Sequence, residues 1–253
     1  MAKLIDISNF IDELAPTNLR CAWDNDGLQV CKNTDCEINN ILFCLDVTDN
    51  VIKEAKKMKA ELIISHHPLI FSPINAINCN VPEAGLSIEL ISSGISLISA
   101  HTRLDRAEHG VNRLLAETIG LKNIETFGED NIGLIGTIEN TTCKELAKIT
   151  KSKLKVPGVS YVLGNKKVKK AAVVFGSGKE YANEALKKGA DVLITGDISY
   201  TAHTLAYRLG IAMIDAGHFY TEIPILYKLR DRITDQFPNI KSKIFTKNFV
   251  EVL

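Results

Sequence analysis

Short apolar runs alternate along this chain with segments whose apolar residues recur at helical spacing. Residues 41–45 and 62–64 are continuous apolar runs of strand length, which predict buried strands. Between them, residues 49–58 place their apolar side chains on one face of a helix. The same order recurs along most of the chain. It predicts an α/β fold in layers, with a largely parallel sheet.

The remaining elements follow from the same two patterns. The expected strands are residues 41–45, 62–64, 95–99, 132–138, 159–163, 168–174, 192–194 and 211–214. The expected helices are residues 7–14, 49–58, 82–93, 111–119, 143–154, 180–188, 201–209 and 223–232.

Two stretches of the first half resemble two stretches of the second half, in the same order. Residues 57–65 align with residues 187–195, and residues 94–101 align with residues 210–218 when one inserted residue is allowed. Such self-similarity predicts an internal duplication. We therefore expect one unit, residues 1–253, built of two similar α/β lobes of about residues 1–125 and 126–253. A ligand site is expected at the junction of the lobes, because small-molecule sites are common there.

Composition excludes several classes of partner. Lys plus Arg and Asp plus Glu both number 30, and aromatic residues make up only 6% of the chain, which argues against nucleic acid as a partner. No apolar run reaches the roughly 20 residues that a membrane span needs. The first residues lack the features of a signal peptide, so we expect a cytoplasmic address without membrane partners. The six cysteines form no C-x-x-C pair, which predicts reduced thiols.

Histidines and carboxylates stand at the ends of three expected strands. His66 and His67 follow the strand at residues 62–64, and Pro68 comes directly after them. The other two groups share the spacing His-x-x-x-carboxylate, which on a helical turn puts both side chains on one face. They are the pair His101 and Asp105 and the pair His218 and Glu222.

This pattern predicts a metal site, in one of two forms. Neighbouring side chains in a strand point to opposite faces, so His66 and His67 can share a site only where the strand has ended. Alternatively, each serves one ion of a pair about 3.5–4 Å apart, with Asp105 and Glu222 as the bridging candidates. Imidazole and carboxylate ligands suit Zn, Mn, Fe, Co or Ni. His101 is either a ligand or a residue that orients one, and a single histidine at a strand end can also be purely structural.

Two further features are weaker candidates for substrate contacts. A Gly-Ser-Gly turn follows the strand at residues 168–174, and its backbone N–H groups could receive an anion or simply form a tight turn. The turn consists of Gly176, Ser177 and Gly178. His203 lies on an expected helix and is either a surface residue or part of a substrate pocket.

Taken together, the motifs resemble a known family over residues 4–252. The motifs are Trp-Asp-Asn-Asp-Gly-Leu at 23–28, Ser-His-His-Pro-Leu-Ile-Phe at 65–71, His-Thr-Arg-Leu-Asp at 101–105, Gly-Ser-Gly at 176–178, Thr-Gly-Asp at 195–197 and Gly-His-Phe-Tyr-Thr-Glu at 217–222. This order resembles the NIF-three-like, YbgI-type family of GTP cyclohydrolase 1 type 2 homologues. The resemblance implies a two-lobed α/β fold, a toroidal homohexamer and a dinuclear metal centre that faces its cavity. It implies as metal ligands His66, His67, Asp105, His218 and Glu222.

One residue departs from the family pattern in a way that bears on the substrate. Arg103 stands where the family usually has Asn, and Phe219 conservatively replaces a common Tyr. A cation at position 103 could bind a substrate anion, or its side chain could point away from the metals.

The function expected from these observations is that of a metal-dependent hydrolase with two divalent cations per chain and a metal-bound hydroxide. GTP ring opening and phosphoester or amide hydrolysis are the candidate reactions on a small-molecule substrate, a nucleotide among the candidates. Glu222 and His101 are the expected catalytic residues, and the expected substrate contacts are Arg103, Gly176, Ser177, Gly178 and His203. The alternative is a non-enzymatic metal-binding scaffold or metal chaperone.

Overall fold

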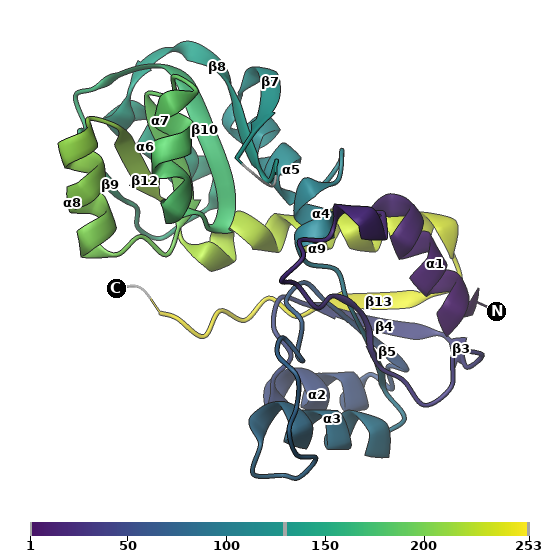
Figure 1. Ribbon diagram of the computed structural model, residues 1–253. Coiled ribbons are helices and arrows are strands. Elements are labelled where there is room, and N and C mark those ends of the chain that lie inside the picture. Colours follow the sequence, from purple (N-terminus) through teal and green to yellow (C-terminus); the bar gives the residue numbers. More distant parts are fainter. Residues whose placement is uncertain (1, 129–130, 252–253) are drawn as a thin grey trace. The chain divides into compact units, whose positions relative to one another are not determined.

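The computed structural model describes residues 2–128 and 131–251. It divides into two compact units (Figure 1). The first unit comprises Met1–Ala107 and Ile225–Lys247, and the second comprises Glu108–Pro224 and Asn248–Leu253. These units are defined by internal contacts and not by sequence similarity. The duplicated lobes, residues 1–125 and 126–253, therefore stay a prediction.

The first unit is built on a sheet whose inner strands are parallel. Its strand order is β13 (Lys241–Ile244), β4 (Asn40–Cys44), β5 (Leu62–Ser65), β6 (Ser96–Ser99) and β2 (Gly27–Val30). All neighbours pair in parallel except β2, which runs antiparallel to β6. The carboxyl ends of β4, β5 and β6 therefore meet at one edge of the sheet.

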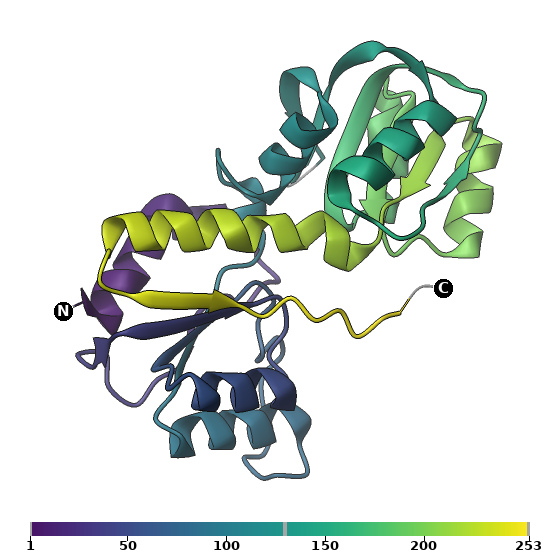
Figure 2. The same cartoon turned by 180° about the vertical axis from the view of Figure 1, so that it is seen from behind.

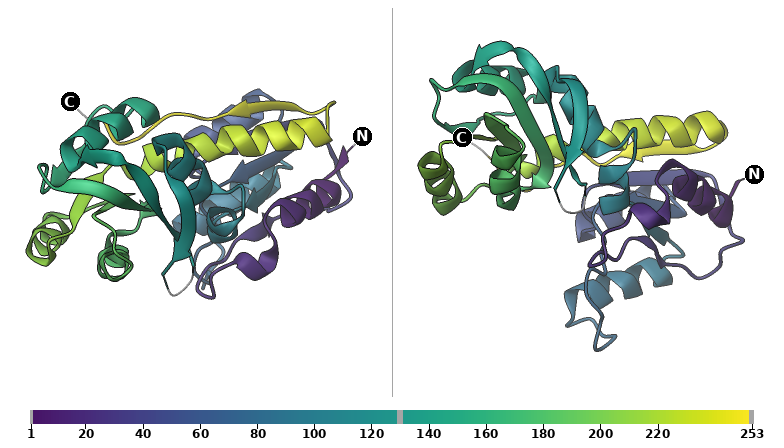
Figure 3. Two further views of the ribbon diagram at one scale, coloured as in Figure 1. Left: turned by 90° about the horizontal axis from the view of Figure 1, so that it is seen from above. Right: turned by 45° about the horizontal axis from the view of Figure 1, so that its top comes forward.

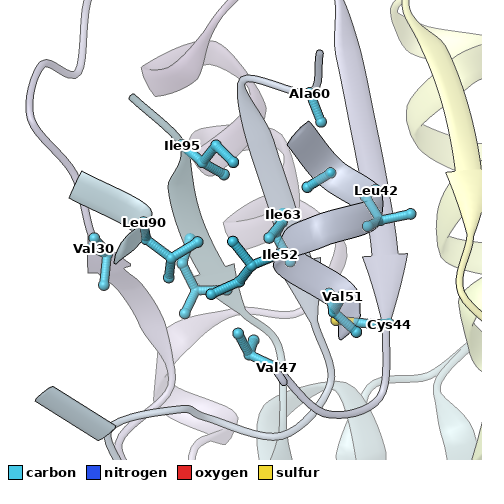
Figure 4. Packing of buried hydrophobic residues seen from close by; sticks show 12 residues of the cluster. Val30, Leu42, Cys44, Val47, Val51, Ile52, Ala60, Ile63, Leu90 and Ile95 are labelled. Atoms are coloured by element: carbon cyan, nitrogen blue, oxygen red, sulfur yellow. The ribbon is translucent and has the colours of Figure 1, made fainter. Parts of the chain in front are cut away.

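Helices cover both faces of this sheet (Figure 1). On one face, α2 (Asp49–Lys57) and α3 (Pro82–Ser92) pack against alternate strand residues. Figure 4 shows this core, in which Ile52 of α2 and Leu90 of α3 lie against Ile63 of β5. Burying each such aliphatic side chain contributes roughly 1.5–3 kcal/mol to the free energy of folding. This core therefore stabilises the sheet whose carboxyl edge carries the candidate site.

The other face of the first sheet carries α1 (Leu4–Leu14) and the later part of α9 (His218–Gln236). Phe10 and Phe237 meet edge to face, with ring centroids 5.7 Å apart. After α9 the chain turns back and β13 runs along the helix (Figures 2 and 3). Smaller elements complete this unit: β1 (Ala2–Lys3) pairs antiparallel with β3 (Glu37–Ile38), and the short helices are η1 (Thr17–Leu19) and α4 (Thr102–Arg106).

The second unit contains a mixed sheet. Its strand order is β7 (Lys122–Phe127), β8 (Gly133–Thr142), β10 (Lys167–Ser177), β11 (Val192–Gly196), β12 (Ala212–Asp215) and β9 (Ser160–Val162). Only β10, β11 and β12 pair in parallel, and the outer strands are antiparallel. The expectation of a largely parallel sheet is therefore right for β10, β11 and β12 and wrong for β7, β8 and β9. Here β7 and β8 are joined by a short connection, which can link only antiparallel strands.

Helices also cover both faces of the second sheet. One face carries α5 (Val111–Ile119) and α6 (Cys143–Leu154), seen from behind in Figure 2. The other carries α7 (Ala182–Lys187), which follows the 3-10 turn η2 (Lys179–Tyr181), and α8 (Tyr200–Leu209). Across the part of the chain that the structure describes, none of the helices has the length and apolarity needed to cross a membrane.

Candidate functional site

Three histidines gather at the carboxyl edge of the first unit's sheet. Because β5 ends at Ser65, His66 and His67 lie beyond the strand, and His101 lies beyond the end of β6. The ring centroids are 5.0 Å apart for His66 and His67, 5.3 Å for His66 and His101, and 5.5 Å for His67 and His101. One ligand nitrogen from each ring lies within 4.8 Å of the others, so this three-histidine group could hold a metal ion.

The Nδ1 atom of each of these histidines points at an oxygen acceptor. For His66 the acceptor is the carbonyl oxygen of Ala100, 2.8 Å away. For His67 it is Oδ1 of Asp46, and for His101 it is Oδ1 of Asp24, both at 2.9 Å. A carbonyl or an ionised carboxylate can only accept, so Nδ1 carries the proton and donates it. In the neutral ring, Nε2 then carries the lone pair that binds a metal.

Asp24 is the most constrained of these acceptors. Its other oxygen accepts from the backbone N–H of Thr102 (3.1 Å) and from the Thr102 hydroxyl (2.6 Å). Burial pushes the pKa of Asp24 upward, but hydrogen bonds from His101 and Thr102 outweigh it and bring the pKa to about 2. Asp24 is therefore an anion that fixes both the ring of His101 and the start of α4.

Asp105 lies beside the same group. It is buried on α4, and its Oδ1 is 3.5 Å from Nε2 of His66. The expected helical spacing of His101 and Asp105 is therefore present, with His101 at the residue before α4 and Asp105 on the first turn of the helix. Asp105 adds a carboxylate oxygen to the three imidazoles.

The second unit carries the remaining pair at the start of α9. His218 is the first residue of the helix and Glu222 lies one turn later, with Nε2 of His218 3.0 Å from Oε2 of Glu222. This contact confirms that the pair shares one helix face. The Nδ1–H of His218 donates to Oδ2 of Asp197, at 2.7 Å, and Asp197 follows the end of β11. His218 thus repeats the arrangement of the other three histidines.

Glycines leave room for this pair. Gly176 has φ +57°, and a Cβ at that position would lie 2.2 Å from Oε1 of Glu222 and 3.0 Å from Nε2 of His218. A Cβ on Gly196 would lie 2.5 Å from the backbone N of His218. The Glu222 carboxylate itself is buried, at 4% exposure. The glycines at the ends of β10 and β11 therefore form a cradle in which the carboxylate and the imidazole fit.

We expect Gly176→Ala to disturb this cradle with only a moderate loss of stability. The new methyl group has to displace the Glu222 side chain, and an alanine at positive φ costs about 1–2 kcal/mol. Metal affinity measured by competition with a chelator should fall by roughly 10- to 100-fold, as for other losses of ligand orientation. Gly189→Ala is the matched control, because Gly189 also has positive φ, +82°, but no atom lies within 4 Å of its Cβ position. Equal metal affinity in both variants would contradict the cradle.

The Gly-Ser-Gly turn is engaged within the fold. The N–H of Gly176 donates to the Thr221 hydroxyl (3.2 Å), and the N–H of Gly178 donates to the Thr195 hydroxyl (2.8 Å). The sequence makes these two backbone N–H groups candidate donors to a substrate anion, but in the structure both donate to threonine hydroxyls of the same unit. Ser177 is exposed and pairs with Gly196 across β10 and β11.

His203 contacts the edge strand of the second unit's sheet. Its Nε2 is 3.0 Å from the hydroxyl oxygen of Ser160, which is on the edge strand β9. Burial lowers the pKa of His203. The described contacts thus place it between α8 and β9, where Ser160 pairs with Asp215 at the carboxyl end of β12.

Arg103 is a structural residue of the first unit. It is 1% exposed, and its Nε donates to Oδ2 of Asp26 at 3.0 Å. Its guanidinium also bonds to Asp12 and to the carbonyl oxygen of Ala15. These contacts fit the alternative in which the side chain points into the fold, and they leave the proposed contact with a substrate anion without support.

The residues that sequence reasoning missed are the histidines' acceptors. Asp46 and Asp197 each follow a strand end within two residues, and Asp24 belongs to a motif that had carried no role. A usable signal was present, because acidic residues just beyond parallel strands lie at the same edge as the histidines.

Removing one of these acceptors should weaken metal binding without changing the backbone. Asp197 has φ +55°, a conformation that Asn also tolerates, so Asp197→Asn keeps the turn and removes the charge that orients His218. Metal affinity should fall roughly 10- to 100-fold, as for other outer partners of ligating histidines. The exposed Asp231, which pairs with Arg230, supplies the control Asp231→Asn with unchanged affinity. The interpretation fails if Asp197→Asn binds metal like the control.

The residues present suit a divalent transition metal. Imidazole nitrogens and carboxylate oxygens are the ligand types that Zn, Mn, Fe, Co and Ni accept. In each of the four histidines Nδ1 has an oxygen acceptor, an arrangement that suits ligation through Nε2, and the cradle keeps the Glu222 carboxylate beside His218. The described His and Glu groups could therefore hold metal.

Comparisons with known proteins point to one family. Residues 2–249 match the family described as Duf34/NIF3 (NGG1p interacting factor 3). A Clostridium perfringens protein named GTP cyclohydrolase 1 type 2 homolog is 36% identical over 97% of this chain and 96% of its own length. A Helicobacter pylori protein named GTP cyclohydrolase 1 type 2 is 32% identical over 88% of each chain.

Solved structures agree with this match. A Staphylococcus aureus protein is similar with a TM-score of 0.87 and 28% identity, over 100% of this chain and 99% of that one. Reduced HcgD from Methanocaldococcus jannaschii is similar with a TM-score of 0.83 and 29% identity, over 96% of this chain and 97% of that one. The match over nearly the whole length confirms the family expected from the motifs, and the chain belongs to the Duf34/NIF3 family.

Proposed function

We propose that this chain binds two divalent cations and is a metal-dependent hydrolase. The proposed ligands are His66, His67, His101 and Asp105 in the first unit and His218 and Glu222 in the second. The observation that carries the proposal is the hydrogen bond that all four histidines make through Nδ1. In each of the four, Nδ1 donates to a fixed oxygen acceptor, which leaves Nε2 as the ligand nitrogen.

This arrangement favours metal binding over a purely structural role. A structural histidine needs only one good hydrogen bond, and four histidines would have no reason to present the same nitrogen. Carboxylate acceptors also raise the basicity of the imidazole and hold its ring in one orientation. Two of the four acceptors follow parallel strands directly, so the sheets themselves position the ligands.

When bound, divalent cations supply Lewis acidity, which polarises a carbonyl, ring-carbon or phosphoryl centre and acidifies water. The protein's part is to orient and to hold protons. Asp24, Asp46 and Asp197 keep the imidazole protons on Nδ1, and the buried carboxylates Asp105 and Glu222 lie next to His66 and His218. Glu222 is the group that we propose to accept and return a proton.

The names of the relatives suggest the first substrate to try. The Helicobacter pylori protein is named GTP cyclohydrolase 1 type 2, so GTP ring opening is the first candidate reaction for this chain. Phosphoester and amide hydrolysis are the next. The test is turnover by the metal-loaded protein, followed by chromatography, across nucleotides, phosphoesters and cyclic amides. Turnover that disappears in Glu222→Gln supports the proposal, and a panel without any turnover contradicts the hydrolase.

The internal duplication is part of the same proposal. The aligned segments fall on β5 and β11 and on β6 and β12, which are neighbouring parallel strands in their own sheets. This common placement supports a duplicated α/β unit as the origin of the two ligand groups.

A further inference from the structure

Two exposed aromatic side chains lie next to the three-histidine group. Trp23 is 56% exposed and Phe71 is 48% exposed, and their ring centroids are 6.1 Å apart at an interplanar angle of 50°. The Trp23 ring also meets His101 edge-on, at a centroid distance of 6.2 Å. Exposed aromatic rings that lie together beside a candidate metal group mark a candidate ligand-binding surface. We call this pair the aromatic wall.

The backbone that carries the aromatic wall is held rigidly. Asn25, two residues after Trp23, donates to the carbonyl oxygen of Ile70 at 2.6 Å. Gln29 also bonds to Ile70, donating to its carbonyl oxygen (3.0 Å) and accepting from its N–H (3.1 Å). Asp24, directly after Trp23, is fixed by Thr102 and His101. These hydrogen bonds restrain the backbone next to both rings, which reduces the entropy cost of ordering the wall when a ligand binds.

Two neighbouring cavities adjoin Phe71 of the wall and His67 of the histidine group. One, of about 440 Å³, is lined by Phe71, Leu69 and Glu83 among others. The second, of about 220 Å³, is lined by His67 and Asp46 and again by Leu69 and Glu83. Phe71 therefore borders a space large enough for part of a small molecule.

We infer that Trp23 and Phe71 form a stacking site for a planar heteroaromatic ring of the ligand that the metals act on. The inference rests on the proposed metal function and adds the class of substrate. A flat ring can stack on the exposed face of one of the two rings and meet the other at an inclined angle, whereas an aliphatic chain gains only apolar burial. Stacking is tolerant of ring identity because every heteroaromatic ring has a π face. Specificity would then come from the groups that line the neighbouring cavities.

Trp23 makes the test direct because it is the single tryptophan of the chain. Its fluorescence, excited at the red edge of tryptophan absorption, reports the wall alone. Guanosine, adenosine and nicotinamide are titrated into the metal-loaded full chain, with ribose as the non-aromatic control. The wall predicts saturable quenching by at least one of the aromatic probes and no quenching by ribose. Absence of saturable quenching by all three overturns the inference.

Variants separate this inference from the metal proposal. Phe71→Leu keeps an apolar side chain and should lower the affinity for the quenching ligand roughly tenfold, as expected for a lost stacking partner. Its metal content should equal that of the wild type. Ile91→Ala removes another exposed apolar side chain of the first unit, on α3, and should bind the ligand like the wild type.

The remaining outcomes are decisive as well. Unchanged ligand affinity in Phe71→Leu overturns the wall and leaves the metal proposal standing. Quenching that persists in protein shown to bind no metal supports the wall and removes the metal function. Trp23 emission that shifts with protein concentration, together with a change of oligomeric state in Trp23→Phe, would mean that a second copy covers the wall, and this also overturns the inference.

Discussion

Replacing His66 with alanine is expected to remove at least one metal ion per chain and to lower turnover by more than about 100-fold, since loss of an outer partner alone costs 10- to 100-fold. His66 is 1% exposed, and its Nε2 faces Asp105 at 3.5 Å. Its alanine variant therefore lacks the most buried imidazole of the three-histidine group. Metal content is measured by elemental analysis after dialysis against metal-free buffer.

A histidine outside the group supplies the control for this experiment. His109 is exposed, so His109→Ala should keep the metal content of the wild type. Circular dichroism shows whether His66→Ala is folded. Wild-type metal content in a folded His66→Ala variant would mean that the three-histidine group is not the site.

Replacing Arg103 with alanine is expected to lower the free energy of unfolding by roughly 3–5 kcal/mol, as for other buried ion pairs that lose one partner. Arg103 and Asp26 are both 1% exposed at the side chain, with Nε 3.0 Å from Oδ2. Burial already raises the pKa of Asp26, and the Arg103 charge opposes that shift. Without Arg103, a buried carboxylate and a cavity remain. Urea unfolding followed by circular dichroism measures the change.

An exposed arginine provides the comparison for this loss. Arg113 pairs with Glu117 one helical turn away on α5, with both side chains partly in solvent. Because exposed pairs of this spacing contribute only about 0.3–0.5 kcal/mol, Arg113→Ala should change stability little. If Arg103→Ala were as stable as Arg113→Ala, the buried ion pair would not contribute to stability. That result would favour the other hypothesis, in which Arg103 binds a substrate anion.

The elements that sequence predicted best are those with a strong apolar period and a clear end. The helix expected at residues 111–119 is α5, which ends at Gly120 with φ +93°, and the helix expected at 143–154 is α6. Residues 180–188 were expected to form one helix but are divided between the 3-10 turn η2, which begins directly after Gly178, and α7. Short and polar elements such as β1, β3 and β13 lack enough apolar residues to be recognised.

Another difference in the fold concerns α9. Its expected start was residue 223, but the helix begins at His218 and contains Pro224. Residues 218–222 show no apolar period because their side chains serve the site, and a proline inside a helix usually marks its first turn. The candidate site residues at the start of α9 therefore lack the apolar spacing from which a helix start is predicted.

The candidate ligands could be selected from the sequence, but the residues that support them could not. Identical residue types at three strand ends were enough to select His66, His67 and His218, because ligands bind beyond the carboxyl ends of strands in α/β sheets. The acceptors of the Nδ1 protons needed the structure, since Asp24 is 77 residues from His101. The structure was also needed to show that Arg103 is buried, because the sequence alone does not distinguish a buried arginine from an exposed one.

The most direct test of the metal proposal is an anomalous-scattering X-ray structure of the wild-type chain crystallised with its bound metal. The account predicts metal peaks about 2.0–2.2 Å from the ligand atoms, the Nε2 nitrogens of the four histidines among them. It also predicts that every Nδ1 keeps its oxygen acceptor. Peaks bound through Nδ1, or the absence of any peak at these histidines in metal-loaded crystals, would contradict it.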